Sequence, residues 1–310
     1  MTKTNESIIP FPPADVSHFL RKWLDLPYAN LSPAQKLDIY LPDVGEGPFP
    51  VILQIHGGGF DLGDKRDFKV LTFLKGLEHG YAVVSVNYRL SGEATFPAGL
   101  QDVKAAIRWL RANSEQYHLD GSRIAAWGGS SGGNYAAMVC LTANVTQFDD
   151  LRLGNPEYPC NVQVAVDWYG PTDFLKMDEQ LDESGFGPSN HDSADSPESR
   201  YLGAKLSDVP LKVELANPMT YIHERMPPLL IQHGSLDTMV PVQQSIMFAE
   251  KLGKYISGDR FEFDIVEGAG HGDPLFETEE NMERVFSFLD KYLRKEQLIE
   301  RRPAPSKITI

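Results

Sequence analysis

The chain has 310 residues, of which 42% are hydrophobic and 23% are charged, as in ordinary globular domains. This length suffices for one large core. The 29 basic and 43 acidic residues give a formal net charge of −14 at pH 7. Such an acidic surface repels nucleic-acid phosphates and anionic lipids, so we expect neither nucleic-acid nor membrane partners.

Three features of the sequence bear on where the protein resides in the cell. Cys140 and Cys160 are the only cysteines, which excludes a disulfide framework, and their spacing is not that of a zinc site. The first residues, MTKTNESIIPFPPADV, lack the basic stretch and apolar core of a signal peptide. No apolar run approaches the ~18–20 residues of a membrane span. We expect a cytoplasmic protein, unless a signal peptide has been removed from it.

Short β-rich runs follow one another along the chain. The first, KLDIYLP (36–42), alternates apolar and polar residues and predicts a comparatively exposed strand. Most later runs are continuously apolar and rich in Val and Ile, which is typical of strands buried on both faces. These runs are PVILQIH (50–56), YAVVSVNY (81–88), RIAAWG (123–128), VQVAVDWYG (162–170), PPLLIQHG (227–234) and FEFDIVEG (261–268).

Helical periodicity fills the intervals between these strands. It predicts helices at about 97–113, 131–143, 241–256 and 276–295. Because strands and helices alternate, we expect an α/β fold with a mainly parallel central sheet flanked by helices, in a single domain over 1–310. Residues 1–30 and 296–310 are expected to be peripheral.

Residues 171–217 interrupt the alternation. They contain acidic residues, Gly, Ser and Pro, with only weak helical signals, and they are longer than an ordinary connection. Either a functional insertion or a disordered loop fits this composition. We favour a cap insertion that partly covers the functional site.

The segment WGGSSGGN (127–134) lies between a predicted strand and a predicted helix. A nucleophilic serine on so sharp a strand-to-helix turn needs glycine on either side, because the backbone leaves no room for Cβ atoms. The pattern Gly-x-Ser-x-Gly is satisfied twice, by Ser130 and by Ser131. Steric arguments barely separate these two registers.

A second glycine-rich segment, HGGGF (56–60), ends the strand 50–56. Its N–H groups, with that of the residue after the nucleophile, are suited to bind the oxyanion of a tetrahedral intermediate. A phosphate-binding loop would need Lys and Ser/Thr after the glycines, where Phe60, Asp61 and Leu62 stand. We expect His56 to orient this loop rather than to act as a base.

A nucleophilic serine also needs a base and an acid that orients the base. Asp237 follows the strand 227–234, and His271 follows the strand 261–268, so both lie at the edge where parallel sheets carry their sites. The order Ser, Asp, His along the chain is the one expected for this fold. Asp173, Asp264 and Glu267 are competing acids in less suitable positions.

Together these residues resemble the α/β-hydrolase superfamily, and most of all carboxylesterases related to hormone-sensitive lipase and to bifunctional feruloyl/acetyl-xylan esterases. The likeness extends from about Tyr28 to Leu293. Its motifs are YANLSPAQKLDIYLP (28–42), HGGGF (56–60), NYRLSGEATFPAGLQDVKAAIRWLR (87–111), GGSSGGN (128–134), SPESRYLG (196–203), ANPMTYI (216–222), HGSLDTMVP (233–241) and GAGHG (268–272). The segment SGEATFP lacks the Ala-Pro-Glu form of the hormone-sensitive-lipase branch, which favours the feruloyl/acetyl-xylan side.

The resemblance implies roles for individual residues. A small residue, usually Ala, follows the nucleophile in the family, so Ser130 matches the nucleophile and Ser131 the small position. By the same matching, the N–H groups of Gly58, Gly59 and Ser131 form the oxyanion hole. His271 is then the base and Asp237 orients it, with no metal or organic cofactor.

The resemblance further implies a serine ester hydrolase. Because the cap is short and no long apolar helix is available to line an acyl channel, we expect short-chain acyl groups, and aromatic acyl groups stay open. Its substrates would be small-molecule or carbohydrate-linked esters, such as acetyl or feruloyl esters of plant polysaccharides. Phe60, Trp168 and Tyr169 follow strand ends and are expected to line the substrate pocket. The sequence indicates no oligomeric state.

Two other functions remain as alternatives. A serine peptidase of the prolyl-oligopeptidase kind shares the fold, but such enzymes usually carry a β-propeller before the hydrolase domain, where only ~35 residues stand here. A catalytically silent receptor for a small ligand would typically have lost one of the three candidate residues, and all three are present.

Overall fold

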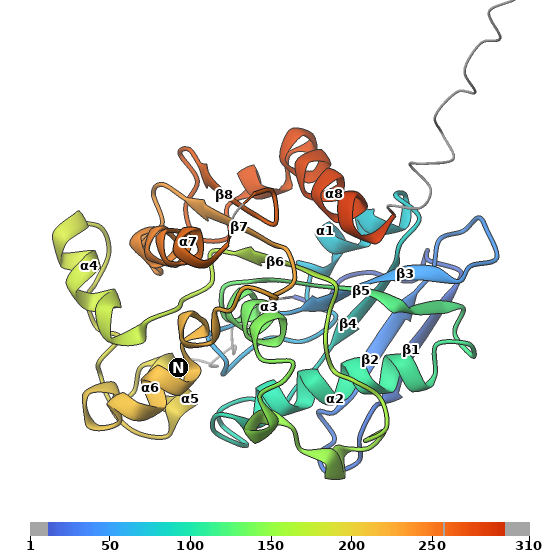
Figure 1. Cartoon of the computed structure of the whole chain (residues 1–310), viewed down its shortest axis with the longest axis horizontal. Coiled ribbons are helices and arrows are strands. Elements are labelled where there is room, and N and C mark those ends of the chain that lie inside the picture. Colours follow the sequence, from blue (N-terminus) through green and yellow to red (C-terminus); the bar gives the residue numbers. More distant parts are fainter. Residues whose placement is uncertain (1–11, 257, 295–310) are drawn as a thin grey trace, which may run out of the picture.

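The computed structural model describes residues 12–256 and 258–294, which contain one eight-stranded sheet of order β1-β2-β4-β3-β5-β6-β7-β8 (Figure 1). The neighbouring strands from β4 to β8 in this order are parallel, whereas β2 runs antiparallel to both β1 and β4. The strands are β1 Lys22–Pro27, β2 Lys36–Tyr40, β3 Phe49–Ile55, β4 Ala82–Val86, β5 Leu119–Gly129, β6 Val164–Trp168, β7 Leu229–Gly234 and β8 Phe261–Val266. The mainly parallel sheet predicted from the sequence is confirmed.

Burial follows the predicted pattern in the central strands. Every residue of β3, β4, β6 and β7 is buried, as continuous apolar runs predict for strands covered on both faces. The prediction of a more exposed strand at 36–42 is wrong, since four of the five residues of β2 are buried. The polar position Asp38 is buried because Lys65 and Arg66 neutralise it at 3.0 and 2.8 Å.

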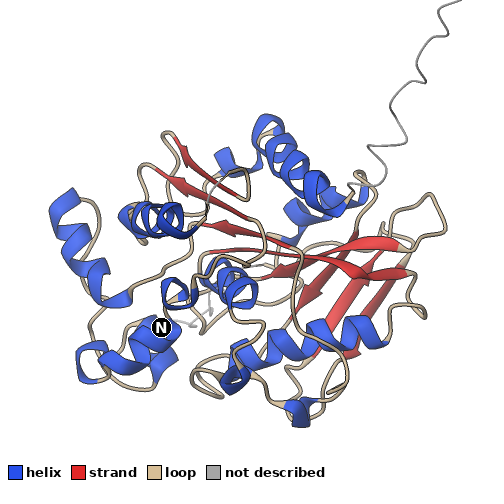
Figure 2. Cartoon of the chain, in the orientation of Figure 1, coloured by secondary structure: helices blue, strands red, loops and turns tan. Residues whose placement is uncertain are grey.

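Helices cover both faces of the sheet, and Figure 2 shows the layers in contrasting colours. Residues of α2, α3 and α7 pack into the larger apolar core on one face, and residues of α1 and α8 into a second core on the other. The helices are α1 Val70–Leu74, α2 Ala98–Ala112, α3 Ser131–Leu141, α7 Gln243–Tyr255 and α8 Glu279–Leu293. All but α1 were predicted from periodicity.

The segment 171–217 is folded into short helices rather than being an irregular loop. These are α4 Met177–Ser184, α5 Pro197–Leu202 and α6 Pro210–Ala216; α5 and α6 lie side by side, while α4 stands apart from them next to α7 (Figure 1). The signals for α5 are local: the Ser196 side chain accepts from the N–H of Ser199, Pro197 begins the helix, and Gly203 ends it in a left-handed conformation.

The sequence predicted that both ends of the chain are peripheral. Residues 1–30 are not wholly peripheral, because β1 pairs with β2 and extends the sheet. The segment 296–310 lies outside the described residues.

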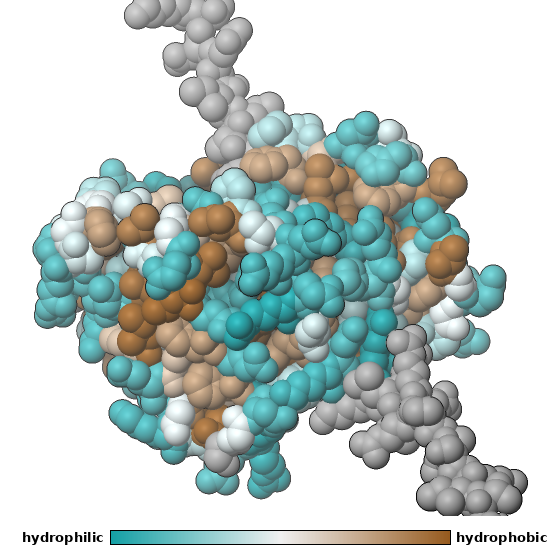
Figure 3. All heavy atoms as spheres, turned by 90° about the horizontal axis from the view of Figure 1, so that it is seen from above, coloured by the Kyte–Doolittle hydropathy of each residue, from teal (hydrophilic) through white to brown (hydrophobic). Residues whose placement is uncertain are grey.

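In the part of the chain that the structure describes, no helix has the length and apolarity to cross a bilayer. On the face shown in Figure 3, apolar patches lie within a largely hydrophilic surface.

Candidate active site

Ser130 occupies the turn between β5 and α3 in a strained backbone conformation, with φ 59° and ψ −128°. A Cβ on Gly128 would overlap the carbonyl of Gly132, and a Cβ on Gly132 would overlap the carbonyl of Ile55 on β3. Both glycines are therefore required by the close packing of this turn against β3. Ser131 is fully buried as the first residue of α3, so the geometry distinguishes two serines that the motif alone does not.

The side chains of Ser130, His271 and Asp237 form one chain of hydrogen bonds. His271 Nε2 lies 2.9 Å from Ser130 Oγ, and His271 Nδ1 lies 2.7 Å from Asp237 Oδ2. With a proton on Nδ1, His271 donates to the carboxylate and accepts from the Ser130 hydroxyl. This is the arrangement in which an imidazole removes a proton from serine. The parallel strands β5, β7 and β8 bring the three residues to one edge of the sheet.

Asp237 is held by more partners than His271 alone. Its Oδ1 accepts from the N–H groups of Met239 and Val240, both at 2.9 Å. Its Oδ2 also lies 3.3 Å from Nε2 of His233, a fully buried residue. Burial raises the pKa of Asp237, but the hydrogen bonds from His233 and His271 outweigh it, so the pKa lies well below its usual value. The carboxylate is kept ionised and fixed in place.

His233 is a site residue that the sequence analysis did not assign to the chemistry. Its Nε2 lies 2.8 Å from the carbonyl of Val240, so Nε2 carries the proton, and Nδ1 accepts from the Ser245 hydroxyl at 2.7 Å. The ring thereby supports both the loop of Asp237 and the carboxylate itself. The spacing His233-x-x-x-Asp237 was visible in the sequence, but nothing in it showed that the two side chains face each other.

The predicted oxyanion loop follows β3 and turns through two left-handed glycines, Gly58 at φ 117° and Gly59 at φ 62°. A Cβ on Gly58 would overlap the carbonyl of Leu62, so glycine is required there. Among the described residues the N–H groups of Gly58 and Gly59 donate to no carbonyl. The N–H of Ser131, at the first position of α3, has no partner within its own helix. All three N–H groups thus lack a backbone partner in the described part of the chain, which is what donors to an oxyanion require.

His56 supports this loop, as the sequence predicted. The ring is buried, stacks on Tyr88 and has its Nδ1 2.8 Å from the Gly57 carbonyl. The Tyr88 hydroxyl donates to the His56 carbonyl at 2.8 Å. Burial lowers the pKa of His56, which favours a neutral ring that donates to the loop.

A cavity of about 400 Å³ opens beside Ser130 and His271. Trp168 and Tyr169 line it, as predicted, and the Tyr169 ring lies 4.9 Å from that of His271. Pro197, at the start of α5, also lines the cavity, so the segment 171–217 contributes to its wall. The prediction for Phe60 is wrong: it is 1% exposed and stacks on Tyr201 at 3.8 Å, away from the cavity lining.

Comparisons with known proteins agree with this fold. The family model BD-FAE matches residues 37–252. A Mycobacterium tuberculosis protein named as a probable carboxylic ester hydrolase, LipM, is 32% identical over 74% of this chain and 51% of its own length. A Bacteroides eggerthii bifunctional GH43-CE protein is 36% identical, with a TM-score of 0.78 over 88% of this chain and 35% of that one.

A truncated carbohydrate esterase from gut microbiota is 30% identical, with a TM-score of 0.80 over 92% of this chain and all of that one. The chain has the α/β-hydrolase fold expected from its motifs. It spans about half the length of the first curated relatives that it matches, 51% of LipM and 56% of the esterase LipQ from the same organism.

Proposed function

The chain belongs to the BD-FAE family, and from this membership and the geometry of the site we propose that it is a carboxylesterase with Ser130 as its nucleophile. One observation carries the proposal. The continuous hydrogen bonds from Asp237 through His271 to Ser130 end beside a cavity large enough for a small ester. Such a chain of contacts activates a serine hydroxyl for attack on a carbonyl carbon.

In the proposed acylation step, Ser130 Oγ attacks the ester carbonyl while His271 Nε2 takes the hydroxyl proton. The Asp237 carboxylate stabilises the imidazolium that forms and keeps the ring in its productive tautomer. When the tetrahedral intermediate breaks down, His271 returns the proton to the leaving alcohol. An acyl group then remains on Ser130.

The negative charge on the carbonyl oxygen is stabilised by the N–H groups of Gly58, Gly59 and Ser131. The N-terminus of α3 adds the positive end of its helix dipole at the same point. Removal of one such donor typically costs ~10²–10³ in turnover. In deacylation, water loses a proton to His271 and attacks the acyl carbon, and the same donors stabilise the second intermediate. The bond between the acyl carbon and Ser130 Oγ then breaks, His271 returns the proton to Ser130, and the carboxylic acid leaves.

The proposed substrates are esters with short-chain or aromatic acyl groups. Trp168, Tyr169 and Phe276 give the cavity an aromatic wall, which suits acyl groups with an apolar body. The solved relative named as a carbohydrate esterase supports carbohydrate-linked esters, such as acetyl or feruloyl esters of plant polysaccharides, among the candidates. The segment 171–217 acts as a small cap in this proposal, since Pro197 closes part of the wall.

A substrate panel tests the proposal. The purified chain should hydrolyse 4-nitrophenyl acetate and butyrate, and acetylated xylan and methyl ferulate then distinguish acetyl from feruloyl esters. Ser130→Ala is the control for uncatalysed and contaminating hydrolysis. Release of 4-nitrophenol at the same rate by wild type and Ser130→Ala would contradict the proposal, as would cleavage of prolyl peptides without ester hydrolysis.

A further inference from the structure

One wall of the cavity carries polar groups that the proposed mechanism does not use. This wall, called the α1 wall below, is formed where β3 faces α1. Its residues are Gln54, Thr72 and Phe73, which line the same cavity as Ser130 and Trp168. Gln54 is 2% exposed, and its Oε1 has no hydrogen-bond partner among the described residues.

Gln54 is not an isolated case. It is in register with Ser85 on β4 and with Trp127 on β5, so the three side chains project from the same face of the sheet. The Ser85 Oγ and the Trp127 Nε1 are also buried without a partner in the described part of the chain. Three neighbouring unpaired polar groups behind an active-site wall are costly in an apolar core, and a native protein keeps such groups where they serve a purpose.

The order of strands indicates which part of an ester reaches this wall. His271 must lie next to the oxygen of the leaving alcohol, and it follows β8, on one side of the Ser130 strand β5. Gln54 belongs to β3, on the other side of β5 (Figure 1). In the proposed reaction the carbonyl oxygen faces Gly58 and Gly59, at the carboxyl end of β3. The acyl chain is then the remaining part of the ester, and it extends from the carbonyl carbon along the cavity toward the α1 wall.

We propose that Gln54 is a specificity residue that binds a hydroxyl group at the far end of the acyl chain. The inference rests on the esterase function proposed above. A hydroxyl both donates and accepts, so it pairs with either end of the Gln54 amide. Gln54 is level with Trp127, three residues before Ser130 in β5, which places it about 10 Å from the nucleophile along the strand direction. Acyl groups of medium length span this distance.

Matched pairs of esters test the proposal on the wild-type enzyme. In each pair a terminal hydroxyl is replaced by a methyl group of similar size. The first pair is 4-nitrophenyl 6-hydroxyhexanoate and heptanoate; the second is 4-nitrophenyl 3-(4-hydroxyphenyl)propanoate and 3-(4-methylphenyl)propanoate. We expect kcat/KM to favour the hydroxylated member of at least one pair by about tenfold, since the apolar member leaves the Gln54 amide unpaired.

Gln54→Leu keeps the approximate size of the side chain and removes the amide that would pair with a hydroxyl. The ratio of kcat/KM within the preferred pair should then fall about tenfold, mainly through loss of the hydroxylated ester. Gln101→Leu, the same change on the partly exposed α2 surface, should keep the wild-type ratio. Circular dichroism establishes that each variant is folded. If Gln54→Leu does not fold, inhibition of wild type by the free hydroxylated and methylated acids supplies the same comparison.

The outcomes separate this proposal from the one it rests on. Turnover of both pairs without preference for the hydroxyl, or a preference that survives Gln54→Leu, would overturn the role of Gln54 and leave the esterase function intact. If wild type hydrolyses neither the two ester pairs nor 4-nitrophenyl butyrate, the esterase function is overturned, and the role of Gln54 with it.

Discussion

Asp167, on β6, is a carboxylic acid with no access to solvent. Its Oδ1 accepts from the N–H of Gly170 at 2.9 Å, while Oδ2 has no partner among the described residues. Burial raises the pKa of Asp167 to about 6, and the Gly170 hydrogen bond and the nearby His233 only partly offset this effect. The group is more easily protonated in the folded chain than in the unfolded one.

This difference predicts how stability depends on pH. Between pH 4 and 6 the folded state holds more protons at Asp167 than the unfolded state, whose reference pKa is 3.8, so stability falls as pH rises. Asp167→Asn removes the titrating group, so the variant does not lose this stability as pH rises. The difference in unfolding free energy, variant minus wild type, should therefore increase by about 2 kcal/mol from pH 4 to pH 7.

Urea denaturation at the two pH values measures the effect. Asp208→Asn, at an exposed position, is the control for loss of one carboxylate. Curves for Asp167→Asn and wild type that stay parallel between pH 4 and 7 would show that Asp167 is not the titrating group.

At the scale of elements, the sequence predicted the strands and helices that have long apolar patterns and missed the short ones. The central strands and the helices α2, α3, α7 and α8 carry periodic patterns that need no tertiary context. In contrast, α1 has five residues and α5 has six, too few to be stable without packing. β1 was missed because Asp25, with φ 58°, and a register shift interrupt its alternation.

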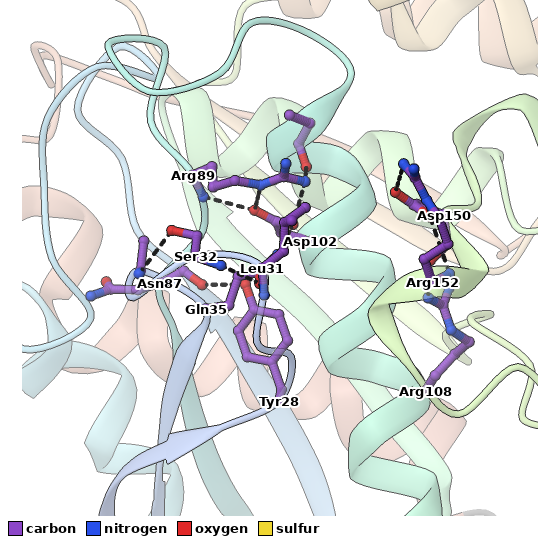
Figure 4. A network of polar contacts seen from close by, with 12 residues as sticks. Tyr28, Leu31, Ser32, Gln35, Asn87, Arg89, Asp102, Arg108, Asp150 and Arg152 are labelled. Atoms are coloured by element: carbon purple, nitrogen blue, oxygen red, sulfur yellow. Dashed lines mark hydrogen bonds and ion pairs between the residues drawn. The ribbon is translucent and has the colours of Figure 1, made fainter.

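One buried network connects elements far apart in the sequence (Figure 4). Asp102 on α2 accepts hydrogen bonds from the Arg89 guanidinium, at 2.8 Å on each oxygen, and from the Gln35 amide at 2.7 Å. Gln35 in turn accepts from the N–H groups of Leu31 and Ser32. The carboxylate thus holds together the loop before β2, the chain after β4 and helix α2.

Removal of this carboxylate should be strongly destabilising. Asp102→Ala leaves the Arg89 charge, which is 11% exposed, without its partner, and we expect a loss of about 3–5 kcal/mol of unfolding free energy. Asp150→Ala, which breaks a pair with the 87% exposed Arg152 and removes the acceptor that caps the short helix at the Arg152 N–H, should cost about 1–2 kcal/mol. Thermal and urea unfolding of the two variants measures the contrast. Equal losses would contradict the role assigned to the network.

At the scale of the whole molecule, the sequence indicated where the candidate site lies, because parallel strands bring their carboxyl ends to one edge. Ser130, Asp237 and His271 could be placed from the strands they follow. The positions of Phe60 and His233 could not be predicted. Phe60 packs into the core against Tyr201, which is distant in the sequence, and His233, in β7, faces Asp237 only because the chain after β7 turns back toward this strand. The unpaired amide of Gln54 likewise becomes visible only with its neighbours in place.

The depth of the cavity sets a limit on the acyl group. Gln54, in its wall, lies about 10 Å from Ser130 along the strand direction, whereas an extended palmitoyl chain is about twice as long and would leave about half of its methylenes in water. Each methylene that stays exposed forgoes ~0.8 kcal/mol of binding. We therefore expect kcat/KM for 4-nitrophenyl butyrate to exceed that for the palmitate at concentrations below micelle formation. The reverse order would contradict the assignment of this cavity as the acyl site.

The central claim is that Ser130 is the nucleophile and that Ser131 contributes only its N–H. An organophosphate that labels nucleophilic serines, followed by peptide mass spectrometry, tests it most directly. We expect stoichiometric attachment to Ser130 with loss of esterase activity, no label on Ser130→Ala, and normal labelling of Ser131→Ala, which keeps the backbone donor. Attachment to Ser131, or labelling of Ser130→Ala to the same extent as wild type, would contradict the account.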